Sequence, residues 1–96
     1  MDHPDLRQEI CDTARRMNAE GLNQGVSGNL SARTPDGALL LTPSATAYET
    51  MGPADVVRME MDGRWSCPAA QRRPTTEWRF HRDILHARAE VGAVVH

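Results

Sequence analysis

The chain has 96 residues, of which 40% are hydrophobic and 25% charged, so it suffices for one small folded domain and is too short for two. Its net charge of -2 comes from interspersed acidic and basic residues, and no basic stripe favours nucleic-acid binding. All 11 basic residues are arginines, which excludes a lysine Schiff base and a lysine general base. Carbonyl chemistry on this chain would therefore need another electrophile, for which a metal ion is the usual substitute.

The two cysteines, Cys11 and Cys67, lie far apart and outside any Cys-x-x-Cys pattern, which favours two reduced thiols. The N-terminus is acidic and polar, unlike a signal peptide. No apolar run approaches the roughly 20 residues that a membrane span needs. These features predict a cytoplasmic protein that does not bind membranes.

Apolar residues recur at helical spacing near the N-terminus, where Asp2 or Asp5 can cap the start of a helix and Gly21 can end it. This pattern predicts a helix over residues 4–20. Three glycines and two asparagines then predict a loop over residues 21–29.

A β-hairpin is predicted next, with strands over residues 30–33 and 38–42. The Thr-Pro-Asp-Gly sequence at residues 34–37 is typical of the tight turn that joins them. A second loop follows over residues 43–53, and alternating apolar residues then predict a strand over residues 56–61.

The last third of the chain contains a short strand over residues 64–66, a helix over residues 77–88 and an apolar strand over residues 91–96. Thr75 or Thr76 is expected to cap the helix. The order helix, strands, helix, strand predicts a layered α/β or α+β domain. An apolar last strand is expected inside a sheet, with neighbours and cover on both faces.

Two segments could bind an anion. Gly28 and Asn29 belong to the donor-rich segment 25–29, where glycines let backbone N–H groups approach an anion closely, although such a turn is also common as plain structure. Thr75 and Thr76 stand where a helix begins, and helix N-termini attract phosphate. Simple helix capping is the competing interpretation.

Two side chains could take part in catalysis or metal binding. Glu77 could act as a general acid or base beside an anion site, or supply only a favourable first-turn charge. His96 ends an apolar strand and could bind zinc, but one histidine does not make a zinc site. His81 stands one turn after Glu77, a spacing typical of an exposed helix pair, and it is given no role. His3 and His86 are given none either.

The order of these signals is specific. Along the chain occur Gly-Leu-Asn-Gln-Gly-x-x-Gly-Asn-Leu-Ser, Thr-Pro-Ser, Tyr-Glu, Pro-Thr-Thr-Glu-Trp-Arg-Phe-His and Ala-Val-Val-His. In this order the motifs resemble the class II aldolase/adducin family, and in particular its branch of zinc-dependent L-fuculose-phosphate aldolases. The resemblance extends from about Leu6 to His96, and Glu-Trp-Arg-Phe-His is its most specific part.

This resemblance implies a three-layer α/β/α domain with a central, mainly antiparallel sheet, of which the chain holds the N-terminal portion, about half of the fold. Family members usually form tetramers with sites between subunits. They cleave or isomerise phosphorylated ketoses through a metal-bound enediolate. The implied function is a metal-dependent aldolase-type lyase, with Zn2+ as cofactor and a fuculose-phosphate-like ketose phosphate as substrate. The implied partners are this phosphorylated sugar and further copies of the chain.

The resemblance also implies a role for each matching residue. Glu77 would be the catalytic acid/base at the metal, and His96 would be the first of three histidine ligands. The phosphate pocket would be lined by five residues: Gly28, Asn29, Ser44, Thr75 and Thr76. The family places another histidine two residues further on and a third far downstream. We therefore expect the 96 residues alone to be inactive, to bind zinc weakly and to self-associate.

Some alternatives stay open within the resemblance. Glu77 followed by Trp78 favours the aldolase branch over the epimerases, which carry aspartate at this position, whereas related dehydratases and decarboxylases also carry glutamate. A non-catalytic, adducin-like remnant or interaction module is an alternative of another class. Ala45 departs from the aldolase pattern, which usually has glycine in this phosphate loop, and its β-carbon alters how the backbone can approach an anion.

Overall fold

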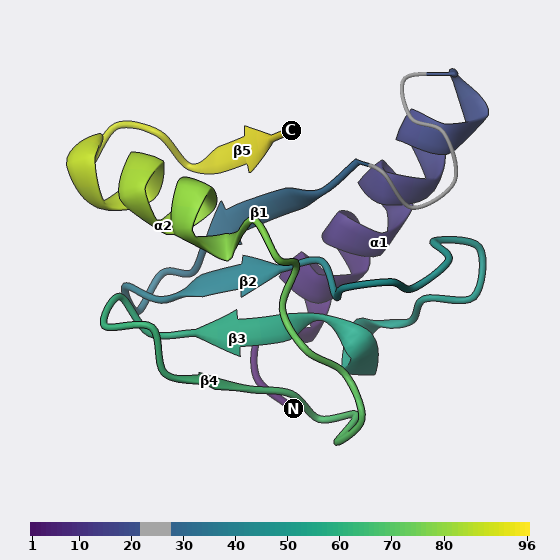
Figure 1. Ribbon diagram of the computed structural model, residues 1–96, viewed down its shortest axis with the longest axis horizontal. Helices are drawn as coiled ribbons and strands as arrows, with labels where there is room; N and C mark the ends of the chain where they lie inside the picture. The colour runs from purple at the N-terminus through teal and green to yellow at the C-terminus, as the bar shows by residue number, and fades with distance from the viewer. Residues whose placement is uncertain (22–27) are drawn as a thin grey trace.

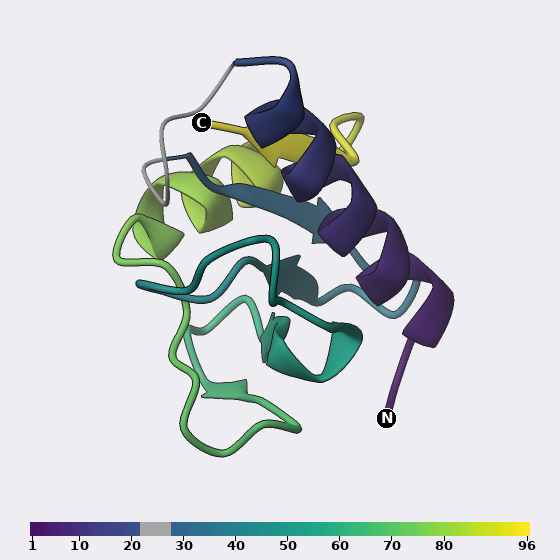
Figure 2. The same ribbon diagram turned by 90° about the vertical axis from the view of Figure 1, so that its right-hand side faces the viewer.

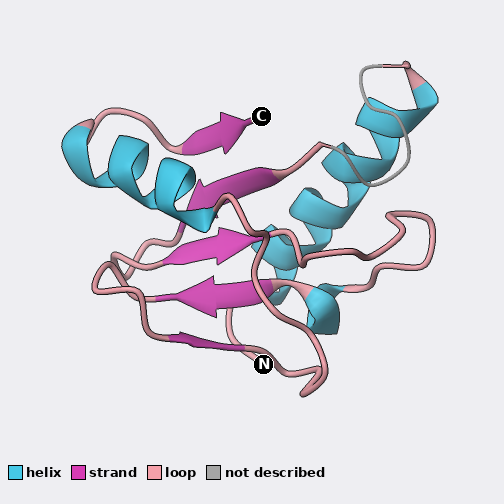
Figure 3. Ribbon diagram, viewed as in Figure 1, coloured by secondary structure: helices cyan, strands magenta, loops and turns pink. Residues whose placement is uncertain are grey.

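The computed structural model describes residues 1–21 and 28–96 of the chain. A five-stranded sheet lies between two α-helices, and a short 3-10 helix, η1 (Pro53–Asp55), interrupts one of the loops (Figures 1 and 3). Gly25 and Ser27 of the predicted anion-binding loop lie outside the described residues. Among the helices that the structure does describe, none has the length and apolar character to cross a membrane.

The sheet has the strand order β4-β3-β2-β1-β5, and all neighbouring strands are antiparallel. Its strands are β1 (Leu30–Arg33), β2 (Leu39–Leu41), β3 (Val57–Met59), β4 (Trp65–Ser66) and β5 (Ala93–Val95). The first four strands form a meander, whereas β5 returns after the second helix to pair with β1 (Figure 1). Each strand lies within a segment that the sequence predicts to be extended.

The helix α1 (Pro4–Ala19) covers one face of the sheet (Figure 2). It ends with Glu20 as C-cap and with Gly21 at φ 74°, the left-handed conformation that glycine adopts readily. The prediction that Asp2 or Asp5 caps its start is wrong, because His3 occupies that position at φ 47° and no side chain in the described part of the chain caps the helix. The Asp2 carboxylate instead binds the Arg7 guanidinium.

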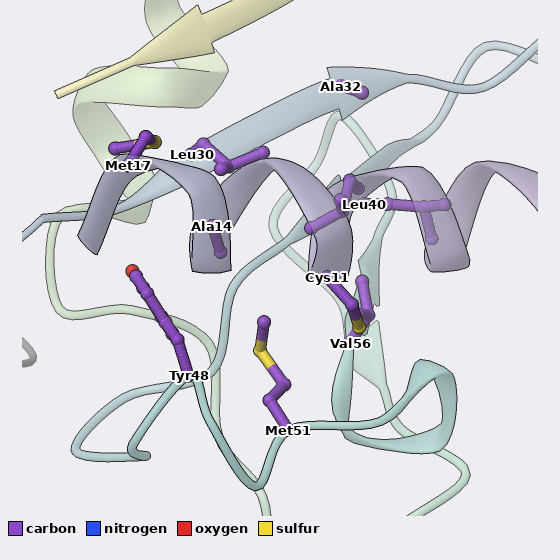
Figure 4. Close-up of a cluster of buried hydrophobic side chains, with 10 residues drawn as sticks. Cys11, Ala14, Met17, Leu30, Ala32, Leu40, Tyr48, Met51 and Val56 are labelled. Atoms are coloured by element: carbon purple, nitrogen blue, oxygen red, sulfur yellow. The ribbon is translucent and has the colours of Figure 1, made fainter. Parts of the chain in front are cut away.

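The face of the sheet toward α1 holds the larger hydrophobic core. Alternate residues of a strand point to opposite faces, so Leu30 and Ala32 of β1 and Leu40 of β2 all point toward α1. They pack there with apolar side chains of the helix and of the long loop after β2 (Figure 4). The helix and loop members of this cluster are Ile10, Cys11, Ala14, Met17, Tyr48, Met51 and Val56.

The opposite face is covered by α2 (Trp78–Ala87) (Figure 2). Leu39 and Leu41 of β2 and Met59 of β3 pack there against Leu85 of the helix. All three residues of β2 are fully buried, as expected for a strand covered on both faces. The structure therefore confirms the three-layer α/β/α arrangement with an antiparallel sheet.

The C-terminal end of α2 is held by Arg33, the last residue of β1. Its guanidinium donates to the carbonyl oxygens of Leu85, Arg88 and Val91, with Nη2 3.2 Å from Arg88 O and 3.0 Å from Val91 O. These carbonyls belong to the end of the helix and the turn after it, which have no intrahelical donors. Arg33 therefore fixes α2, and the turn that leads into β5, against the sheet.

β5 lies at an edge of the sheet in these 96 residues, although an apolar strand usually lies inside a sheet with cover on both faces. Its residues are exposed or half-buried, and the Val95 side chain is 60% exposed. A hollow of about 240 Å³ lies between α1 and the β1–β5 pair, lined by apolar side chains that include Leu6, Ile10 and Val95. This edge and hollow therefore leave apolar side chains of the sheet only partly covered.

Candidate active site

The candidate site lies where β1 begins, β5 ends and α2 starts (Figure 1). Asn29 and His96 form one further antiparallel pair beyond the two strands. The Asn29 N–H donates to His96 O at 2.9 Å, and the His96 N–H donates to Asn29 O at 2.8 Å. Residues paired in this way point to the same face of a sheet, and Ser31 lies two residues further along that face, toward α2.

Glu77 is the N-cap residue of α2 and reaches both members of this pair. Its Oε2 contacts His96 Nδ1, and Asn29 Nδ2 donates to its Oε1 over 3.5 Å, a long hydrogen bond. The side chains of Glu77 and His96 are 40% and 48% exposed, so the carboxylate and the imidazole remain open to solvent. The structure thus brings together three residues that the resemblance assigns to the site.

The expectation that Thr75 or Thr76 caps α2 is wrong, because Glu77 takes this position and no side chain of residues 1–21 or 28–96 caps the helix. The backbone of Thr75 instead binds the loop after β2, where the Thr75 N–H donates to Thr42 O at 3.0 Å. An isolated antiparallel bridge between Pro43 and Pro74 continues the same contact.

Three of the five residues assigned to phosphate binding, Ser44, Thr75 and Thr76, come from these two adjacent segments. The Ser44 N–H donates to Arg73 O at 2.8 Å, which places Ser44 beside the segment that leads to Thr75 and Thr76. Thr75 is buried, Ser44 is half-buried and Thr76 is exposed. Their neighbourhood is an observed fact, whereas their role toward phosphate stays a prediction.

Gly28, another of the five residues assigned to phosphate binding, is buried and is held by a hydrogen bond from the core beneath α1. Its carbonyl oxygen accepts the hydroxyl proton of Tyr48, a side chain of the core beneath α1 (Figure 4). Burial raises the pKa of the Tyr48 phenol, which therefore stays protonated as a donor. The Tyr-Glu motif of the sequence thus contributes a tyrosine that anchors the backbone next to Asn29.

Ala45 has φ 51°, in the left-handed region that favours glycine. The sequence resemblance singles out this position because the aldolases usually have glycine there. The backbone of the chain nevertheless adopts the conformation that a glycine would adopt. The difference at Ala45 is therefore an added β-carbon on an exposed residue.

The structure corrects the prediction made for His81. The sequence suggests an exposed pair with Glu77, but the His81 side chain is fully buried between α2 and β1. Its Nδ1 lies 2.7 Å from Ser31 Oγ, and its Nε2 contacts Asn29 Oδ1. Burial and, to a lesser extent, the nearby His96 lower the pKa of His81 to about 4, although Glu77 partly opposes them. The imidazole is therefore neutral at pH 7.

Sequence reasoning also missed Phe80, whose ring lies 4.9 Å from the ring of His96 and 6.0 Å from that of His81, centroid to centroid. A signal for His81 was available, because Trp78, His81 and Leu85 share one face of the helix at spacings of three and four residues. Phe80, which is 47% exposed, lies within the Glu-Trp-Arg-Phe-His motif, but its helical position alone gives no such signal.

The site fits a divalent metal in the type of its donors. An imidazole and a carboxylate face each other at His96 and Glu77, and imidazole nitrogen is a common zinc ligand. The number of ligands is too small, because residues 1–21 and 28–96 contain no group of three or more His, Cys, Asp or Glu side chains that could hold a metal ion. His96 would be one ligand of an incomplete set.

The fold and the site together define the class of this protein. It is an α/β/α domain in which a solvent-exposed carboxylate and imidazole, Glu77 and His96, meet at the start of α2 beside the sheet. The family profile described as "Class II Aldolase and Adducin N-terminal domain" matches residues 8–96, and the chain belongs to this family.

Relatives and solved structures agree with this assignment. The 5-methylthioribulose-1-phosphate/5-deoxyribulose-1-phosphate aldolase of Rhodospirillum rubrum is 48% identical over 91 residues, which make up 95% of this chain and 39% of that protein. The L-fuculose phosphate aldolase of Haemophilus influenzae is 38% identical over 96 residues, 100% of this chain and 43% of that protein. The structure of an L-fuculose 1-phosphate aldolase matches with a TM-score of 0.90 and 26% identity, over 100% of this chain and 45% of that one. The chain thus spans less than half the length of these relatives.

Proposed function

We propose that the protein to which these residues belong is a metal-dependent aldolase-type lyase that cleaves a ketose phosphate. The observation that carries the proposal is the Glu77 carboxylate, held between the His96 imidazole and the Asn29 amide and open to solvent. Membership of the family supports the same reaction class.

Glu77 is the proposed proton carrier. Cleavage of a ketose between the carbons α and β to its carbonyl removes a proton from the β-hydroxyl group and later returns one to the α-carbon. A side chain in contact with the substrate must move such a proton. The exposed carboxylate of Glu77 can do so, while the Asn29 amide and the His96 ring hold it in place.

His96 would hold the metal ion, for which zinc is the candidate that the family resemblance gives. A bound divalent ion would supply a Lewis acid that polarises the carbonyl of the substrate. Because the chain has no lysine, carbonyl activation through a Schiff base on these residues is excluded.

The phosphate group would lie beside the adjacent segments that carry Ser44, Thr75 and Thr76, with Gly28 and Asn29 on the other side. The bridge between Pro43 and Pro74 supports this proposal, because it brings hydroxyl groups and backbone from distant parts of the chain to one place. The substrates named for the two relatives, L-fuculose phosphate and 5-methylthioribulose or 5-deoxyribulose 1-phosphate, are the candidates.

The test is an assay of the full-length protein, meaning the complete gene product, with these ketose phosphates and their unphosphorylated forms. We expect release of an aldehyde and a phosphorylated three-carbon ketone from at least one phosphorylated substrate. We also expect chelation to abolish this activity and zinc to restore it. Loss of water without cleavage of a carbon–carbon bond would identify a dehydratase instead. Binding without any turnover would favour the adducin-like alternative.

A further inference from the structure

The side-chain amide of Asn29 is held from both ends. Asn29 is 5% exposed, and its Oδ1 accepts a hydrogen bond from the ring of His81, while its Nδ2 donates to Glu77 Oε1. An asparagine amide can rotate by half a turn and exchange its donor and acceptor at little steric cost. Something must therefore select the orientation in which the NH2 group faces Glu77.

The buried imidazole of His81 makes this selection. A neutral imidazole carries one N–H, and both ring nitrogens of His81 have partners on β1 or next to it. The Ser31 hydroxyl can either donate or accept, so it accommodates either state of Nδ1. The amide oxygen of Asn29 can only accept, so the proton must lie on Nε2 and Ser31 must donate to Nδ1.

The opposite orientation of Asn29 would be doubly unfavourable. The Asn29 NH2 group would then face His81 Nε2–H, which places two donors against each other. The Asn29 oxygen would face the Glu77 carboxylate, which places two acceptors against each other. The same oxygen would face the phosphate group that the proposed function places beside Asn29. The site needs a donor toward both anions, and only the observed orientation provides it.

We propose that His81 is a positioning residue that keeps the amide nitrogen of Asn29 turned toward Glu77 and toward the anionic substrate. This inference rests on the proposed function for its consequence in catalysis, although the hydrogen-bond arrangement itself does not. His81 touches neither the carboxylate nor the substrate and acts only through Asn29.

The kinetic test compares His81→Leu with His81→Gln in the full-length protein. Leucine fills the space without a donor, whereas the side-chain NH2 of glutamine can stand where Nε2–H stands. We expect His81→Leu to lower kcat/KM for the ketose phosphate by about 10- to 100-fold, the usual range for a hydrogen bond to a charged group. His81→Gln should recover activity to within about threefold of the wild type. His86→Leu, on the exposed side of the same helix, should leave kcat/KM unchanged.

A second comparison separates positioning from mere packing. Asn29→Ala should lower kcat/KM strongly in the wild type and only slightly in the His81→Leu background, because the amide is already misdirected there. Equal losses in both backgrounds would overturn the proposal. So would a His81→Gln variant that is folded and as inactive as His81→Leu.

A measurement without turnover tests the arrangement independently. Nitrogen-15 NMR of the full-length wild-type protein at pH 7 should show His81 as the Nε2–H tautomer, with a hydrogen-bonded Nδ1. An Nδ1–H tautomer or a charged imidazole would overturn the proposal even if the enzyme is active. Conversely, if the protein cleaves no ketose phosphate but shows the Nε2–H tautomer, the proposed function fails and the positioning of Asn29 stands.

Discussion

A buried neutral histidine next to an exposed carboxylate makes the site sensitive to acid. The pKa of His81 falls from an ordinary 6.5 to about 4 because burial disfavours the imidazolium, and His96 adds to this effect. The charge of Glu77, which also lies near the ring, acts in the opposite direction and raises the pKa of His81. The unfolded chain therefore binds the His81 proton more tightly than the folded chain does. The contribution of the neutral His81 to the free energy of unfolding is complete above pH 6.5 and is lost as the pH falls toward 4.

We therefore expect the free energy of unfolding to fall between pH 7 and pH 4.5 by about 2 kcal/mol more in the wild type than in the His81→Gln variant. Urea denaturation at the two pH values measures this difference. His86→Gln is the matched control, since His86 is exposed, and it should behave as the wild type does. An equal pH dependence in all three proteins would contradict a buried neutral His81.

Ala45 carries local backbone strain. A left-handed conformation is unfavourable for any residue with a β-carbon, and the Ala45 φ of 51° lies in this region. Ala45→Gly should raise the free energy of unfolding by about 0.5–1 kcal/mol, after the greater freedom of glycine in the unfolded chain is subtracted. Ala47→Gly, on an exposed residue of the same loop without a positive φ, should lower it by a similar amount. Thermal denaturation distinguishes the two, and destabilisation by both would disprove strain at Ala45.

At the scale of elements, hydrophobic periodicity and turn chemistry were enough to predict both helices and all five strands to within a few residues. Gly21 was predicted correctly as the end of α1, whereas the N-terminal caps of the two helices were not predictable in this way. Thr75 has the side chain of a good cap, but its backbone is bound to Thr42 across the loop contact. Helical periodicity places His81 on the buried face of α2, but it does not show the polar partners that make burial possible, Ser31 of β1 and the adjacent Asn29.

The site depends on how α2 is fixed to the sheet, and Arg33 provides one such attachment. Arg33→Met should lower the free energy of unfolding by about 2 kcal/mol, because several carbonyls lose a charged donor. Arg64→Met is the control: Arg64 is exposed and, among the described residues, forms an ion pair only with Asp62, so its loss should change stability by less than about 0.5 kcal/mol. Chemical denaturation compares them, and equal stability of the two variants would show that Arg33 does not secure the helix.

For the molecule as a whole, the ordered motifs predicted the family and the fold more securely than any single residue did. They also singled out Glu77 and His96, which the structure brings into contact, while the roles of these two residues stay predictions. The resemblance to half of a fold also implied that the last strand would lack cover in these 96 residues, and β5 lies at an edge of the sheet.

The uncovered edge predicts how the 96 residues behave on their own. Exposed apolar side chains on an edge strand favour pairing with another chain, so we expect concentration-dependent self-association. Light scattering across a dilution series measures it. Val95→Lys should weaken association, whereas Gln71→Lys, which adds the same charge at an exposed residue outside the strands, should not. A monomer at every concentration would contradict this expectation.

The central claim is that Glu77 carries the proton in the cleavage of a ketose phosphate. The most direct measurement is the rate of carbon–carbon bond cleavage by the full-length protein with Glu77 and with Glu77→Gln, which keeps the size of the side chain and removes its charge. We predict a loss in kcat of about 10²- to 10⁴-fold, the usual contribution of a general acid or base. A Glu77→Gln variant that is folded and cleaves the substrate within about tenfold of the wild-type rate would contradict the claim.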